Sequence, residues 1–557
     1  MLPRDVSRTG GGDAAVVYPP FRGSADRRSL LDRAHRGDIL GAFGSVESFD
    51  TGPRLSPRRR LATFLAIAGP GIVVLVADND AGSFSVYAQA GQDYGLGLLW
   101  LFLLLAPVLY VLQEMVARLG AVTGAGHARL IFERFGRRWG AFALGDLLAL
   151  NLLTLVTEFI GVDFALRYFG VSRYVSVPVA AAALLGFTAT GRFRRWEQAM
   201  YALVAMNLVA VPLALMSHPR AGAIVSSAVP GLRDEFTPTG VLFMMAIVGA
   251  ALSPWQLFFQ QSNVVDKRIT ARWLNYERFD TLAGAMLFTI VGAAMIVACA
   301  FAFGGSPFHG GFVDLGAAAH ALAARLGASA GALFALVLLN GSVLCAAVVT
   351  LTTSYALGDV LGLKHSLHRR WRDAPTFYGS FAALVGLAAT VELVPGIPLG
   401  TVTTIVQALA GVLLPSATVF LLLLCNDRAV LGPWVNPRWL NAVATVIVGV
   451  LLVLSALLTT TTLLPRVDVR MAALVLGGGL VLGLAIAGVI TFRRAGTSSP
   501  FAGTPWERAT WTMPALETIA PPVPSRARTL GLVVLRLYLT LAALLLIVKA
   551  VQVIPIG

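Results

Sequence analysis

Long apolar segments recur along this chain, and no other feature constrains its fold as strongly. A transmembrane helix needs about 20 predominantly apolar residues, and apolar runs of 18 residues or more recur throughout the sequence. Of all residues, 57% are hydrophobic and only 13% are charged, whereas soluble proteins carry about 25% charged residues. The sequence therefore predicts an all-α polytopic membrane protein that is embedded in a lipid bilayer.

Thirteen apolar segments can be delimited, and an odd number of spans places the two termini on opposite sides of the membrane. The segment at 174–190 is short and rich in alanine, so the number of membrane spans could differ from thirteen by one. The segments lie near residues 61–90, 97–119, 139–166, 174–190, 196–217, 237–263, 280–305, 329–358, 374–395, 400–425, 438–462, 470–492 and 527–553.

Basic residues are concentrated in alternate loops between these segments. Fifteen Lys and Arg residues lie in the loops 120–138, 192–195, 264–279 and 359–373, whereas the intervening loops hold five. Basic loops mark the cytoplasmic side of a membrane protein, and eleven arginines in residues 1–60 place the N-terminus on that side as well. The net charge of +14 therefore indicates topology and contact with anionic lipid headgroups rather than nucleic-acid binding.

Two of the first ten apolar segments are interrupted by polar or helix-breaking residues. The first carries VADNDAGSF at 76–84, and the sixth carries GAALSPWQ at 249–256, where Pro254 lacks the backbone donor that a continuous helix needs. Matched breaks five segments apart are typical of an inverted repeat of five plus five helices, in which the unwound segments form a substrate site at the membrane midplane.

This pattern predicts four regions in the chain. Residues 1–60 are expected to be a basic, mostly disordered cytoplasmic tail. Residues 61–217 and 237–426 would be the two five-helix repeats, and residues 427–557 would add about three accessory C-terminal helices.

Asp80 is the strongest candidate for a functional residue. A carboxylate near the centre of a membrane helix costs about 2.5–3.5 kcal/mol on insertion scales, and no basic residue lies in the apolar part of segments one to ten that could pair with it. For Asp78 two interpretations stay open: it lines an aqueous vestibule, or it caps the half-helix that begins after the break.

An acid at the break favours a cation as the substrate. Free carbonyls at Ala77 and Ala250 and the side chains of Ser83, Ser253 and Gln256 would add hard oxygen donors, a set that suits Mg²⁺ or Mn²⁺. Gln407 could reach a hydrated ion or form a helix–helix hydrogen bond, and Glu158 could serve as a relay or a structural residue. We expect Cys299, Cys345 and Cys425 to be small core residues without a disulfide or zinc site.

Five local stretches resemble the Nramp family of divalent-metal transporters, over residues 61–426. They are GPGIVVLVADNDAGS in the first segment, QEMVARLGAVTG at 113–124, TEFIGVDFAL at 157–166, GAALSPWQLF in the sixth segment and QALAGVLLP at 407–415. The resemblance implies a leucine-transporter-type fold with broken first and sixth helices. It places the family's metal-binding aspartate on Asp80, its carbonyl donor on Ala250 and its third-helix glutamate on Glu158.

The chain also departs from the family pattern at several site positions. The family's asparagine falls on Ser83, its methionine on Ser253 and the histidine after the proline on Trp255, and an acid of proton-coupled members becomes Leu155. This combination resembles the Nramp-related magnesium transporter branch. It implies acceptance of Mg²⁺ beside Mn²⁺ and puts proton coupling in doubt.

Three functional hypotheses follow. The first is a monomeric transporter, not an enzyme and without a cofactor, that carries Mg²⁺ and Mn²⁺ across a bacterial plasma membrane by alternating access and without proton coupling. The second is a proton-coupled Mn²⁺/Fe²⁺ importer in which Glu158 carries the proton. The third is a non-transporting metal sensor or scaffold that binds a partner through its basic tail.

Overall fold

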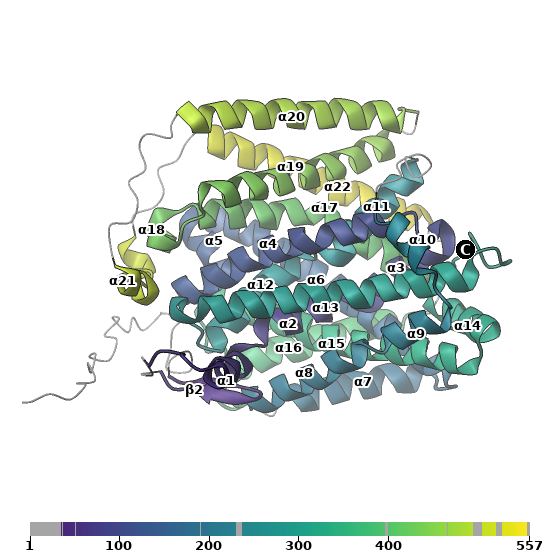
Figure 1. The fold of residues 1–557 in the computed structure, drawn as a ribbon, viewed down its shortest axis with the longest axis horizontal. Coiled ribbons are helices and arrows are strands. Elements are labelled where there is room, and N and C mark those ends of the chain that lie inside the picture. Colours follow the sequence, from purple (N-terminus) through teal and green to yellow (C-terminus); the bar gives the residue numbers. More distant parts are fainter. Residues whose placement is uncertain are drawn as a thin grey trace, which may run out of the picture.

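A computed structural model describes residues 35, 37–48, 50, 52–189, 191–229, 237–395, 399–464, 466–493, 504–519 and 526–553. Long helices lie side by side and form almost the whole molecule (Figure 1). Within the described residues nine helices are long and apolar enough to cross a membrane, or ten if one bent pair counts as a single span. The predicted all-α polytopic fold is confirmed.

Each of the thirteen predicted apolar segments contains at least one helix, although some are shorter than a full span; α7, for example, has 16 residues. The helices are α1 (Pro57–Ile67), α2 (Pro70–Ala77), α3 (Ala81–Tyr94), α4 (Leu99–Thr123), α6 (Arg137–Tyr168), α7 (Arg173–Thr188), α8 (Phe193–Asn207), α9 (Ala210–Met216), α11 (Pro238–Ala251), α12 (Pro254–Asp266), α13 (Leu274–Phe303), α15 (Ala328–Leu361), α16 (Pro375–Glu392), α17 (Leu399–Cys425), α19 (Arg438–Leu463), α20 (Val469–Arg493) and α22 (Arg526–Val553).

Shorter elements connect these helices. They are α5 (His127–Phe135), α10 (Ala221–Ser226), α14 (Leu315–Leu326), α18 (Arg428–Leu431), α21 (Pro505–Thr510), three 3₁₀ turns, and the strands β1 (Ile39–Gly41) and β2 (Gly44–Val46).

Both predicted helix breaks are present. The first segment bends by 51° between α1 and α2, where Gly69 has a φ of 151° that only glycine adopts readily. It breaks again after Ala77, and α3 begins at Ala81. In the sixth segment α11 ends at Ala251 and Pro254 starts α12, a first-turn position at which the missing N–H of proline is not needed.

The two breaks meet inside the bundle. Helix α2 packs against α12, α3 packs against α11, and α13 runs along α2, α3 and α4. Helix α17 lies so close to α11 that a Cβ on Gly249 would stand 1.8 Å from the carbonyl oxygen of Gln407. The breaks and the middle of α17 therefore share one small volume.

The helices after residue 426 cover one side of this bundle. Helices α19 and α22 pack on α17, and α20 packs on α19 as the outermost helix of that side (Figure 1). Only 11% of the apolar window of α20 is buried within the protein, as expected for a helix that faces lipid.

The segment before α1 differs from the predicted tail. Residues 1–34 lie outside the described part of the chain, but β1 and β2 form an antiparallel hairpin with Ile39 opposite Val46. Ile39, Ala42 and Val46 are buried, and the hairpin packs on α1. The predicted tail therefore contains a hairpin at 39–46 that its polar, arginine-rich composition did not indicate.

Candidate metal site

Asp80 begins the second half of the first broken helix. Its backbone is extended, with φ −106° and ψ −177°, and its Oδ1 accepts a hydrogen bond of 2.7 Å from the backbone N of Ser83. An aspartate at this position satisfies an amide that the helix leaves unpaired, and the helix dipole favours its negative charge. The capping role that the sequence left open for Asp78 therefore belongs to Asp80.

Two further side chains on neighbouring helices close around Asp80. The Cys345 thiol of α15 donates to Asp80 Oδ2 at 3.3 Å. The Glu158 carboxylate of α6 accepts from the backbone N of Ala81 at 3.2 Å. One ligating atom from each of Asp80, Glu158 and Cys345 lies within 4.8 Å of the others, and all three residues are buried. Within the described residues, neither Asp80 nor Glu158 forms an ion pair with Lys or Arg.

The second broken helix contributes a backbone carbonyl group to the site. The carbonyl oxygen of Ala250 accepts hydrogen bonds from Ser83 Oγ at 2.9 Å and from Tyr87 OH at 3.0 Å. Gln407 of α17 points its amide at Asp80 Oδ1 from 3.5 Å. The structure thus brings together Asp80, Ser83, Ala250 and Gln407, four of the residues that the sequence predicted for the site.

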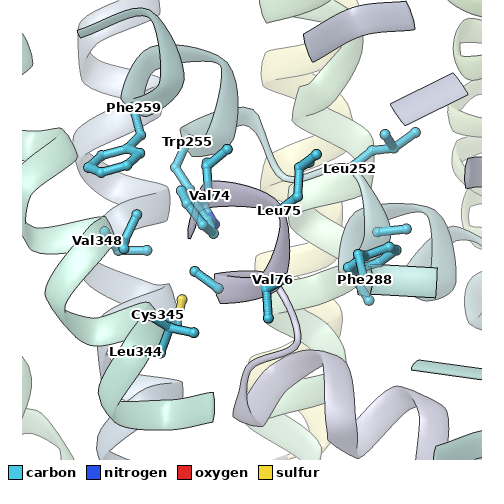
Figure 2. Close-up of a cluster of buried hydrophobic side chains, with 14 of the residues drawn as sticks. Val74, Leu75, Val76, Leu252, Trp255, Phe259, Phe288, Leu344, Cys345 and Val348 are labelled. Atoms are coloured by element: carbon cyan, nitrogen blue, oxygen red, sulfur yellow. The ribbon is translucent and has the colours of Figure 1, made fainter. Parts of the chain in front are cut away.

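Other predicted residues line the same region with different partners. Ser253 Oγ donates to the carbonyl of Gly249 at 2.9 Å, and Gln256 accepts from Gln113 of α4 at 3.0 Å. Trp255 belongs to an apolar wall with Val74 and Phe259 (Figure 2). Among the described residues, no hydrogen bond joins Gln256 or Trp255 to Asp80.

Asp78 and Ala77 form the end of α2. Ala77 is the last residue of that helix, so its carbonyl lies among those that a helix leaves without an internal partner. Asp78 is fully buried, and neither of its carboxylate oxygens has a hydrogen-bond partner among the described residues. A buried acid in this state gains from a bound cation or from water.

Sequence reasoning missed Cys345 and Tyr87 as site residues. Cys345 was expected to be a small core residue; it is buried, but its sulfur faces an acid. It lies on the side of α15 that faces α2 (Figure 2). The two contacts join segments 265 and 163 residues apart in the chain, so no local pattern could indicate them.

Comparison with known proteins agrees with this fold. Residues 71–461 match the Nramp family, described as natural resistance-associated macrophage protein-like. A protein of Verminephrobacter eiseniae named divalent metal cation transporter MntH is 28% identical over 421 residues, which cover 73% of this chain and 91% of that protein. The protein of the same name from Ralstonia nicotianae is 30% identical over 394 residues, which cover 68% and 87% of the two chains.

Solved structures share the architecture. A crystal structure of the Eremococcus coleocola manganese transporter aligns with a TM-score of 0.62 at 20% sequence identity, covering 84% of this chain and 99% of that one. The family match extends over more than half of the sequence and includes the breaks after Ala77 and Ala251. The chain belongs to the Nramp family.

Proposed function

We propose that this protein carries Mg²⁺ and Mn²⁺ across a bacterial plasma membrane by alternating access and without moving protons. The observation that carries the proposal is the pair of buried acids, Asp80 and Glu158, at the meeting point of two broken helices. No Lys or Arg of the described residues forms an ion pair with either acid. The relatives named above as divalent metal cation transporters support the class of substrate.

The side chains at the breaks favour a hard ion. Mg²⁺ dehydrates reluctantly and is usually held by one or two carboxylates together with several retained waters. Asp80 supplies a carboxylate, and the small hydroxyl side chains of Ser83 and Ser253 leave room for water and can hydrogen-bond to it. Within this proposal, residues 61–217 and 237–426 form the two repeats that move against each other, as in other transporters built on inverted repeats.

The hydrogen bonds to the carbonyl of Ala250 suggest how the site opens. Its carbonyl is held by Ser83 and Tyr87 of α3, so an ion that binds there must displace at least one of these hydroxyls. Movement of α3 relative to α11 would free the carbonyl. We propose that the conformation described here is one in which the two half-sites are closed on each other.

A proton-coupled Mn²⁺/Fe²⁺ importer is the second candidate. The specific observation in its favour is the position of Glu158, whose carboxylate lies beside Asp80 and could exchange a proton as the ion binds. A sensor or scaffold that works through the basic tail has weaker support, since the described part of that tail packs on the transport bundle.

Uptake into liposomes tests these alternatives. Purified protein is reconstituted, Mn²⁺ entry is followed with and without excess Mg²⁺, and luminal pH is recorded. We expect Mg²⁺ to inhibit Mn²⁺ entry and luminal pH to stay constant. Acidification that follows metal entry would favour the proton-coupled importer, and Mn²⁺ entry that is insensitive to Mg²⁺ would contradict the magnesium assignment. A variant that lacks residues 1–34 should retain uptake if the sensor hypothesis is wrong.

The remaining features of the proposal concern placement in the cell. The distribution of basic loops supports a cytoplasmic N-terminus, and we propose that the protein works as a monomer. Labelling of single cysteines introduced into the loops at 192–195 and 306–328, in intact cells with an impermeant reagent, should modify only the second loop.

A further inference from the structure

Cys345 stands apart from the other two cysteines of the chain. All three are buried and free, and a buried free cysteine is ordinarily an inert core residue. The thiol of Cys425 faces the carbonyl of Met115 at 3.7 Å, and neither Cys299 nor Cys425 belongs to the group of metal-ligating side chains found among the described residues. Only Cys345 directs its sulfur at a carboxylate of the site.

The three side chains around Asp80 come from three separate helices. Asp80 starts α3, Glu158 lies in the middle of α6, and Cys345 lies in the middle of α15. Helix α6 packs against both α3 and α15, so the packing of the bundle fixes the distances between them. One oxygen of each acid and the sulfur lie within 4.8 Å of one another, a spacing at which one ion can contact all three.

We propose that Cys345 is a metal ligand that gives the site one sulfur donor, so that thiophilic divalent ions of the Zn²⁺ and Cd²⁺ class bind there through sulfur and oxygen, whereas Mg²⁺ is held by oxygen alone. This proposal rests on the proposed transport function and refines its substrate range. The all-oxygen donor set expected from the sequence is thereby replaced by a mixed set.

The chemistry of the donor set supports this division. Thiolate ligands select soft and borderline metals, whereas carboxylates, carbonyls and water suit Mg²⁺ and Mn²⁺. A coordinating thiol loses its proton; the proton is released to water as the metal–sulfur bond forms, and it is regained when the ion leaves. The thiol now donates to Asp80 Oδ2, so an ion that bridges Asp80 and Cys345 would replace that hydrogen bond directly.

Cadmium binding to the purified protein tests the proposal, with Cd²⁺ alone as the probe. X-ray absorption at the cadmium edge should show one sulfur neighbour in the wild type and in the matched controls Cys299→Ser and Cys425→Ser. In Cys345→Ser, whose hydroxyl can still donate to Asp80, only light-atom neighbours should remain. Cadmium affinity should fall by at least about 10-fold, because changes outside the first ligand sphere already weaken metal binding by about 10- to 100-fold.

The outcomes separate this inference from the transport function. A purely oxygen shell in the wild type, or a sulfur neighbour that persists in Cys345→Ser, would overturn the role of Cys345 while leaving transport intact. Cadmium binding and Mg²⁺ uptake that both survive Asp80→Ala would overturn the site itself and the proposed function with it. If the serine variant fails to fold, a purely oxygen shell in the wild type still overturns the proposal, and a sulfur neighbour that is lost in Cys299→Ser or Cys425→Ser overturns it as well.

Discussion

Two of the groups of buried acids among the described residues differ in how their charge is balanced. One group, the Lys267 cluster, consists of Glu197, Lys267, Glu277 and Asp280 near the start of α2. Lys267 Nζ donates to Glu197 at 2.5 Å and to the carbonyl of Ala68 at 2.6 Å. The other group is the site formed by Asp80, Glu158 and Cys345, and Asp78 lies two residues before Asp80 in the chain. Within the described residues, this site contains no basic side chain.

Backbone donors add to the contrast. In the Lys267 cluster, Asp280 accepts from the backbone N of Gly69 at 3.0 Å and of Gly71 at 2.6 Å, and Glu197 accepts from the backbone N of Ala42 in the hairpin at 2.6 Å. Asp78, by comparison, has no hydrogen-bond partner at either carboxylate oxygen among the described residues. A buried charge is tolerated when it is paired and hydrogen-bonded. The Lys267 cluster has its own cation, whereas under the proposed function an ion from outside balances the acids of the Asp80 site.

The largest expected effect is on the Lys267 cluster. Lys267→Met leaves Glu197 buried without its cation, and removal of one partner of a buried pair destabilises proteins by about 3–5 kcal/mol. Thermal unfolding of the purified protein measures the change. Arg129→Ala is the control, because Arg129 pairs with the partly exposed Glu133, and such pairs contribute about 0–1 kcal/mol. Equal losses in the two variants would contradict a special role for Lys267.

Addition of Mg²⁺ should stabilise the folded protein through the Asp80 site and not through the Lys267 cluster. If Mg²⁺ binds the folded protein at the Asp80 site, a concentration 100 times the dissociation constant stabilises it by about 2.7 kcal/mol, and a chelator reverses the gain. Asp80→Asn should lose this stabilisation, whereas Lys267→Met should still show it on its lower baseline. A stabilisation that persists in Asp80→Asn would place the ion elsewhere.

The close approach of α11 to α17 gives an intermediate effect. Gly249→Ala places a methyl group against the carbonyl of Gln407, and overpacking of a tight core typically destabilises by about 1–3 kcal/mol. It should also move Ala250 away from Ser83 and reduce uptake. Gly186→Ala is the matched control in α7, where a Cβ meets no atom within 4 Å. Normal uptake in Gly249→Ala would show that the approach of α11 to α17 is not needed.

The smallest effect is expected at Glu158. Glu158→Gln keeps the oxygen that accepts from the backbone N of Ala81 and removes only a charge. If transport is uncoupled, Mg²⁺ uptake should stay of the same order at saturating Mg²⁺, with a weaker apparent affinity. Loss of uptake at saturating Mg²⁺ would support the proton-coupled alternative.

The sequence predicted the architecture well because apolar length and helix breakers act locally. Pro254 and the polar run at 78–80 indicate breaks without knowledge of the fold, and both breaks are present. Asp80 was identifiable for the same reason, since an acid in an apolar segment is costly wherever that segment packs. These conclusions need only the identity of a residue and of its neighbours in the chain.

Features that depend on contacts between distant segments could not be predicted. Cys345 looks like an ordinary core residue until α15 packs against α6 and α3. The hairpin at 39–46 is held by Glu197, 155 residues away from its partner Ala42. Asp78 and Asp80 are two residues apart and alike in sequence, yet only Asp80 caps α3, because the exact residue at which a helix restarts decides which side chain reaches the free amides.

Uptake of Mg²⁺ into liposomes by Asp80→Ala tests the central claim most directly. Asp163→Asn is the matched control, since Asp163 is a buried acid on the same helix as Glu158 but is paired with Arg167. Asp80→Ala should fold, because loss of a helix cap costs about 1 kcal/mol. Its Mg²⁺ uptake should not exceed the uptake of protein-free liposomes, whereas Asp163→Asn should continue to transport Mg²⁺. Wild-type uptake by Asp80→Ala would contradict the account.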